Sequence, residues 1–160
     1  MTSPLPSPLW LPLLPILAVQ SQQLKTTELS LGAAAALAHE TFAGAELGIA
    51  HRPSNDSRIA LAVAGGVMSP DEAAAVRAQL TIQVLLNSIA RSGAGVYAGV
   101  GAAYLGARDV PGRGFVALVL GVEQAPGRRR GWFIESGFGG GVRVAIGWRS
   151  RWFPSWWRAG

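Results

Sequence analysis

The sequence predicts an all-β protein in which eight antiparallel strands close into an up-and-down barrel. Eight segments alternate between large apolar residues and small or polar ones, which is the two-residue period of a strand. Short stretches rich in Gly, Pro, Ser, Asn and Asp separate these segments. A spacing of about 16 residues per strand and turn leaves room for strands of about 9 to 11 residues. The 160 residues are enough for one domain.

The first three expected strands cover residues 27–38, 41–51 and 57–68. In each of them, large apolar residues occupy one face, and small residues with an occasional charge occupy the other. The charges on the small-residue face are Glu28, Glu46 and Arg58.

The fourth expected strand, 74–87, competes with a helix start. The preceding residues Ser69 to Glu72 have the chemistry of a helix N-terminus, with Ser as the cap, Pro next and Glu at the capping-box position. The residues that follow alternate nevertheless, and on a helix their polar members would be spread over every face. We therefore predict a strand, with Leu85 as the one residue that breaks its alternation.

The next three expected strands cover 95–107, 114–124 and 131–139. The first of these alternates weakly and is rich in Gly, Val and Tyr. The other two repeat the earlier pattern, with Glu123 and Glu135 on the small-residue face.

The eighth expected strand, 141–152, has two chemically different faces. Its even positions are apolar or aromatic except for Ser150, whereas its odd positions hold three arginines, Arg143, Arg149 and Arg151. An aromatic tail, FPSWWRAG, occupies 153–160.

Residues 1–21 are the expected signal peptide or leader. The apolar run from Leu9 to Val19 is shorter than the roughly 20 residues of a membrane-spanning helix, and a small-x-small pattern ends at Ser21. Five prolines interrupt the segment, and no Lys or Arg precedes the run. Residues 22–160 then form the single barrel domain.

The two faces indicate what surrounds the barrel. The chain is 49% hydrophobic and only 14% charged, against about 25% charged in typical soluble proteins. The face opposite the bulky residues is small rather than charged, so it suits a narrow lumen better than a water-exposed coat. The bulky face then meets lipid, which is the pattern of a transmembrane β-barrel. In such a barrel we expect Arg149 and Arg151 to mark the place where the last strand leaves the membrane.

In strand number, alternation, Gly and aromatic placement and leader, the chain resembles the small eight-stranded outer-membrane barrels of the OmpA type. The resemblance implies a cell outer-membrane location, both termini in the periplasm, contact with outer-membrane lipids, and a final strand recognised by the barrel-assembly machinery. The alternating apolar and aromatic residues from Val142 to Trp152 fit that final strand, whereas the FPSWWRAG tail departs from the family pattern. We expect a monomer.

Charges on the inner face predict a lumenal network of Glu and Arg, because buried charges are costly unless paired. Its expected members are Glu46, Arg77, Glu123, Glu135 and Arg143. For Glu28, Arg58 and Arg149, solvation near the strand ends remains an equal alternative. We expect Gln79, Gln83 and Tyr97 to fill polar gaps. An eight-stranded barrel is just filled by side chains, so the network would plug it.

The tryptophans near the end of the barrel predict a membrane-interface aromatic belt, because Trp and Arg together suit the headgroup region. Its expected members are Trp132, Trp148, Trp152, Trp156 and Trp157.

Other function classes find little support. The 13 Arg and one Lys are scattered without a nucleic-acid-binding module, so we expect no nucleic-acid partner. His39 and His51 would lie roughly 30 Å apart on an extended strand, and no nucleophile elbow, phosphate loop or metal-ligand spacing is present. We therefore expect no catalytic residues, cofactor or metal.

The sequence favours a structural or envelope-integrity role without an open pore. One alternative is a soluble or periplasmic lipid-binding barrel, whose bulky face would point inward. Another is an outer-membrane lipid-modifying enzyme. A third is an adhesion-like surface protein. The expected outer turns are short, which leaves little extracellular surface for binding a partner.

Overall fold

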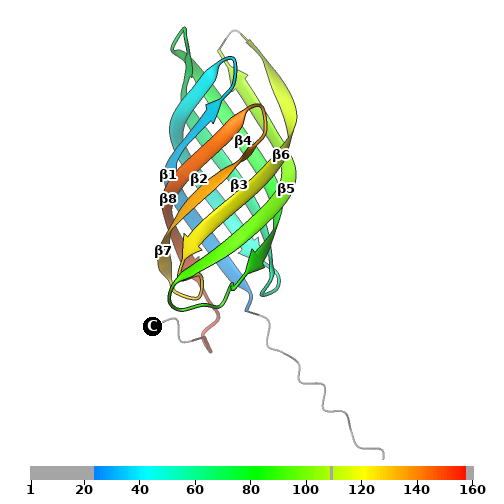
Figure 1. Cartoon of the computed structure of the whole chain (residues 1–160). Coiled ribbons are helices and arrows are strands. Elements are labelled where there is room, and N and C mark those ends of the chain that lie inside the picture. The colour runs from blue at the N-terminus through cyan, green and yellow to red at the C-terminus, as the bar shows by residue number, and fades with distance from the viewer. Residues whose placement is uncertain (1–23, 109, 158–160) are drawn as a thin grey trace, which may run out of the picture.

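The computed structural model describes residues 24–108 and 110–157, which form a closed antiparallel barrel (Figure 1). Its eight strands follow chain order around the barrel, and β1 pairs with β8 to close it. This confirms the predicted all-β, eight-stranded up-and-down barrel. The strands are β1 (Thr26–Leu37), β2 (Thr41–Arg52), β3 (Ser57–Ser69), β4 (Ala73–Leu86), β5 (Ala94–Ala107), β6 (Val110–Gln124), β7 (Arg130–Phe138) and β8 (Val142–Trp152).

The expected leader, residues 1–21, lies outside the described residues. Within the part of the chain that the structure describes, no helix is long and apolar enough to cross a membrane.

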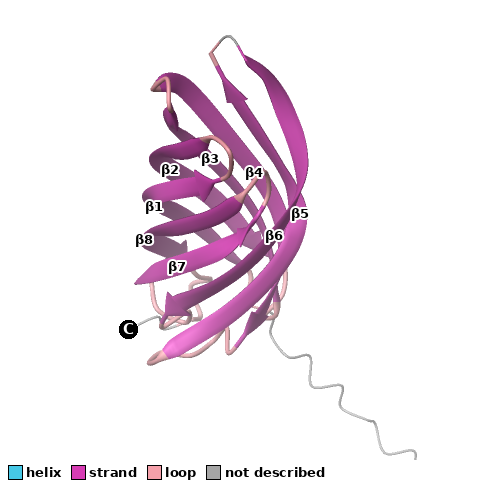
Figure 2. Ribbon diagram, turned by 45° about the horizontal axis from the view of Figure 1, so that its top comes forward, coloured by secondary structure: helices cyan, strands magenta, loops and turns pink. Residues whose placement is uncertain are grey.

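The barrel has two distinct ends. The end where β1 begins and β8 stops, here called the terminal end, also carries the β2–β3, β4–β5 and β6–β7 turns. The opposite end, here called the loop end, carries the β1–β2, β3–β4, β5–β6 and β7–β8 turns. The β3–β4 and β5–β6 hairpins rise furthest at the loop end (Figures 1 and 2).

The competition between helix and strand after Ser69 is resolved in favour of the strand. β3 ends at Ser69, a short turn follows, and β4 begins at Ala73. The β3–β4 ladder is continuous from the Ser57–Val84 pair to the turn. A helix would leave β3 and β5 without their shared neighbour, so ladder pairing outweighs the local capping signal.

The β5–β6 hairpin is longer than the sequence indicates. We expected β6 to begin at residue 114, but it begins at Val110, because the hairpin continues past a bulge near Leu105. β6 pairs with β7 only from Leu118 onward. The first part of β6 therefore has one edge without a neighbouring strand. Pro111 lies in this part, so its missing N–H breaks no hydrogen bond to β7.

The alternation of residues separates the two surfaces of the barrel. The large apolar side chains of the strands face outward, for example Leu31, Ile82 and Val116, which are 64%, 63% and 73% exposed. Inward-facing side chains are small or polar, and Phe42 and Met68 form an apolar cluster with alanines toward the loop end. The core of this protein is thus its lumen.

Candidate functional site

Six charged side chains fill the lumen near the terminal end and are here called the terminal-end cluster. They are Glu28, Arg52, Arg58, Glu123, Arg149 and Arg151, and all are buried. The Glu123 carboxylate accepts hydrogen bonds from all four arginines, at N–O distances of 3.0 Å for Arg52, 2.7 Å for Arg58, 2.5 Å for Arg149 and 2.9 Å for Arg151. Glu28 lies 2.6 Å from the Nε of Arg52 and 2.9 Å from that of Arg58.

This cluster carries an excess of positive charge, because four guanidinium groups face two carboxylates. Neutral acceptors bind some of the remaining N–H groups: Arg52 donates to the Ser88 carbonyl at 3.1 Å, and Arg58 donates to Gln83 at 3.2 Å. The Phe133 ring lies 4.6 Å from the Arg149 guanidinium carbon. Hydrogen bonds and aromatic faces reduce the cost of burying the extra charge without neutralising it.

A second group, here called the central cluster, is built around Arg143. Its guanidinium donates to both carboxylate oxygens of Glu46 at 2.6 Å and to Glu135. Arg77 lies nearby and donates to the Gly139 carbonyl at 2.7 Å and to Gln79 at 2.9 Å. The two carboxylates and two guanidinium groups balance in charge.

Tyr97 connects the two clusters. Its hydroxyl donates to Glu135 at 3.0 Å, and its ring lies 4.9 Å from the guanidinium carbon of Arg58 and 5.4 Å from that of Arg149. Gly121 leaves the space for this ring, because a Cβ at position 121 would overlap it. The lumen therefore contains a continuous column of polar contacts.

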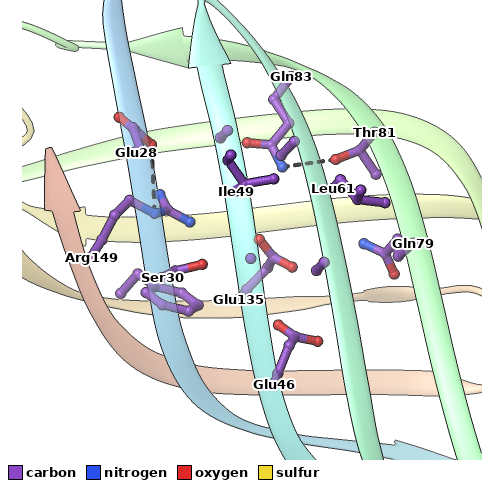
Figure 3. A pocket seen from close by; sticks show the side chains of 15 residues that line it. Glu28, Ser30, Glu46, Ile49, Leu61, Gln79, Thr81, Gln83, Glu135 and Arg149 are labelled. Carbon is purple, nitrogen blue, oxygen red and sulfur yellow. Dashed lines mark hydrogen bonds and ion pairs between the residues drawn. The ribbon is translucent and has the colours of Figure 1, made fainter. Parts of the chain in front are cut away.

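A cavity of about 30 Å³ lies between the clusters (Figure 3). Glu28, Glu46, Glu135 and Arg149 border it from the adjacent strands β1, β2, β7 and β8. Gln79, Thr81 and Gln83 border it from β4. A polar space of this size has room for about one water molecule.

All five residues expected in the lumenal network point into the lumen, but they belong to different groups. Arg143 contacts Glu46 and Glu135, whereas Arg77 contacts a carbonyl and an amide, and Glu123 belongs to the terminal-end cluster.

The alternative of solvation for Glu28, Arg58 and Arg149 is wrong, since they are only 1%, 0% and 6% exposed. Arg151, expected at the membrane boundary, is also buried beside Glu123. Arg52 was not among the expected lumenal residues, because the expected strand ended at residue 51 and Arg52 fell in the turn that follows. Arg52 lies at an even position of β2, as the inward-facing Glu46 does. This shared parity is the sequence signal that could have placed Arg52 in the lumen.

The tryptophans expected in the aromatic belt all lie toward the terminal end. Trp132 and Trp148 are paired neighbours on β7 and β8 and face outward with Trp152. Trp156 is exposed, and the Nε1 of Trp157 donates to a carbonyl of the β6–β7 turn at 3.1 Å. The tail thus folds back along this end of the barrel, and the belt itself remains a prediction.

The two histidines lie at opposite ends of β2. His39 is in the β1–β2 turn and His51 is next to the end of the strand, and both are exposed. Among the described residues, no group of three or more His, Cys, Asp or Glu side chains is placed to hold a metal ion.

The closed meander and charged lumen define the class of small eight-stranded β-barrels. No protein-family model matches the sequence, and no curated protein matches it. The fold is similar to that of the N-terminal β-barrel domain of Pseudomonas aeruginosa OprF, with a TM-score of 0.64 and 13% identity over 82% of this chain and 100% of that one. Ail, the attachment invasion locus protein of Yersinia pestis, is also similar in its complex with sucrose octasulfate, with a TM-score of 0.52 and 14% identity over 80% of this chain and 99% of that one. These likenesses show the fold.

Proposed function

We propose that this protein spans the cell outer membrane as a barrel with a structural or envelope-integrity role and a lumen closed to solutes. The observation that carries the proposal is the distribution of side chains. Large apolar residues face outward, whereas the ten charged residues of the two clusters form ion pairs or hydrogen bonds inside the barrel. A barrel with its apolar side chains outside and its charged side chains inside is stable only with an apolar solvent, such as lipid, around it.

The exposed apolar surface supports a membrane location. The described residues include 29 exposed large hydrophobic side chains, which at about 70 Å² each expose roughly 2,000 Å², several times the 300–600 Å² patch of a soluble monomer. Arg130 is the one Asp, Glu, Lys or Arg at outward-facing positions of the described strands. Strands of 9 to 15 residues are long enough to cross a bilayer when tilted.

The packed lumen supports the absence of an open pore. The terminal-end cluster forms a layer of buried, mutually bonded side chains, and Phe42 closes the opposite side with 0% exposure. The cavity between them has room for about one water molecule. Passage of a solute would require breaking several buried ion pairs together.

The alternatives receive less support. A soluble lipid-binding barrel would hold its ligand against inward-facing bulky residues, whereas here these residues face outward. A lipid-modifying enzyme would need its acid, base and nucleophile close together, and the two histidines are separated by the length of β2. The loop-end turns are short, which leaves little surface for a receptor or adhesion role.

The proposal is tested by membrane fractionation, unheated gel electrophoresis and planar-bilayer recording of the purified protein. We expect a heat-modifiable band in the outer-membrane fraction and no steady conductance. Extraction in buffer without detergent would refute the membrane location. Stable open channels would refute the closed lumen while leaving the membrane location intact.

A further inference from the structure

A pocket of about 310 Å³ lies outside the lumen at the terminal end, where β7 begins and β8 stops. Its walls contain two exposed guanidinium groups, a hydroxyl and two aromatic rings, from Arg129, Arg130, Ser150, Trp152 and Phe153, and Arg151 closes the inner side. Resting on the proposed function, we infer that this pocket binds the phosphate headgroup of an anionic membrane phospholipid.

The charge of the pocket favours a phosphate group. Neither Asp nor Glu lines it, and the buried guanidinium of Arg151 is already bound to Glu123 and to the Arg128 carbonyl. Arg129 and Arg130 are exposed, so their N–H groups are available. Arginine is suited to this ligand because its planar guanidinium can bind two phosphate oxygens at once.

The position of the pocket favours a lipid over a free anion. Arg130 pairs with Ser150 at the end of the outward face, and the next outward pair along the same two strands is Trp132 with Trp148. Trp152, 57% exposed, continues this apolar surface. Basic groups directly beside interfacial tryptophans contact a lipid headgroup and its upper acyl chain together.

The backbone around the pocket is held in place. The Arg151 N–H donates to the Arg129 carbonyl at 2.7 Å, which fixes the last residue before β7 against β8. The tail is fixed by the Trp157 indole bonded to Gly127 and by the Arg91 guanidinium carbon, 4.6 Å from the Trp157 ring. The backbone that carries Arg129 and Arg130 is therefore fixed before any ligand arrives, which lowers the ordering cost of binding.

Native mass spectrometry of the full-length barrel, titrated with phosphatidylglycerol or phosphatidylcholine, tests the inference. We expect phosphatidylglycerol to bind at least about tenfold more tightly. Each arginine near an anionic headgroup contributes about fivefold, so the double variant R129Q/R130Q should weaken phosphatidylglycerol binding roughly 25-fold. R113Q, which removes an exposed arginine at the loop end, is the matched control and should leave binding unchanged.

Equal binding of the two lipids, or an equal loss in R113Q, would overturn the inference. Displacement of phosphatidylglycerol by millimolar inorganic phosphate would also overturn it, because the site would then recognise a free anion. Insertion of the same preparations into phosphatidylcholine vesicles separates the two proposals. A barrel that inserts but shows no preference for the anionic lipid refutes this inference alone, whereas failure to insert into any bilayer refutes the proposed function.

Discussion

Substituting Arg143 with Met should destabilise the barrel more than removal of any exposed arginine. The Arg143 side chain is 1% exposed and binds Glu46 and Glu135, whose side chains are 9% and 7% exposed. The substitution leaves two buried carboxylates near each other, while the Arg77 guanidinium is bound to a carbonyl and an amide. Breaking a buried ion pair by removing one partner costs about 3–5 kcal/mol, so the free energy of unfolding should fall by about this amount.

Equilibrium urea unfolding in phosphatidylcholine vesicles, followed by tryptophan fluorescence, measures this loss. Arg113→Met is the matched control, because that side chain is exposed at the loop end, and it should change stability by less than about 0.5 kcal/mol. The triple variant R143M/E46Q/E135Q should recover most of the loss, since no unpaired charge remains. A loss below about 1 kcal/mol in R143M with an unchanged m-value would refute the reasoning. So would a triple variant that is no more stable than the single one.

Three further predictions follow from the outward face, the ring packing and the terminal-end cluster. Leu31→Arg places a charge at the middle of β1 on the lipid side and should cost about 2–4 kcal/mol in vesicles, whereas a smaller loss would mean that this position meets water. Gly121→Ala overlaps the tyrosine ring packed against it and should cost about 1–3 kcal/mol, while Gly114→Ala, where a Cβ meets no neighbour, should be nearly neutral by the same unfolding assay. Glu123→Gln leaves four buried arginines facing one carboxylate and should cost at least about 3 kcal/mol; equal stability of the variant and the parent would show that the four contacts contribute nothing.

The sequence alternation could predict which face each strand residue occupies, but not which residues meet across the lumen. Arg143 and Glu46 are 97 positions apart and come together through the stagger of the strands, which a two-residue period does not specify. The same limit explains why Glu123 and Arg77 were expected in one network and lie in separate groups.

Strand ends were the weakest part of the sequence interpretation. Arg52 was assigned to a turn because the residues after it have turn chemistry, yet β2 extends far enough to place it in the lumen. Leu85 looked like an exception to the pattern of β4, but it faces inward and packs with Tyr97 and Val119. The inward face accepts an apolar residue where its neighbours are also apolar.

The aromatic tail was a departure from the expected family pattern, and the structure gives part of it a local role. The indole of Trp157 bonds to Gly127, and its ring lies near those of Phe153 and Trp156. These contacts attach the segment after β8 to the β6–β7 turn.

The central claim is that the large apolar face of the barrel meets lipid. The chain contains no cysteine, so a single cysteine introduced at Val116, Leu118 or Leu120 can carry one spin label in a vesicle-inserted barrel. We predict that oxygen, which is concentrated in the bilayer, collides with these labels more often than a water-soluble nickel reagent does. A label at Asp71, in the exposed β3–β4 turn, should show the opposite preference. Preferential collision with the nickel reagent at all three β6 positions would contradict the account.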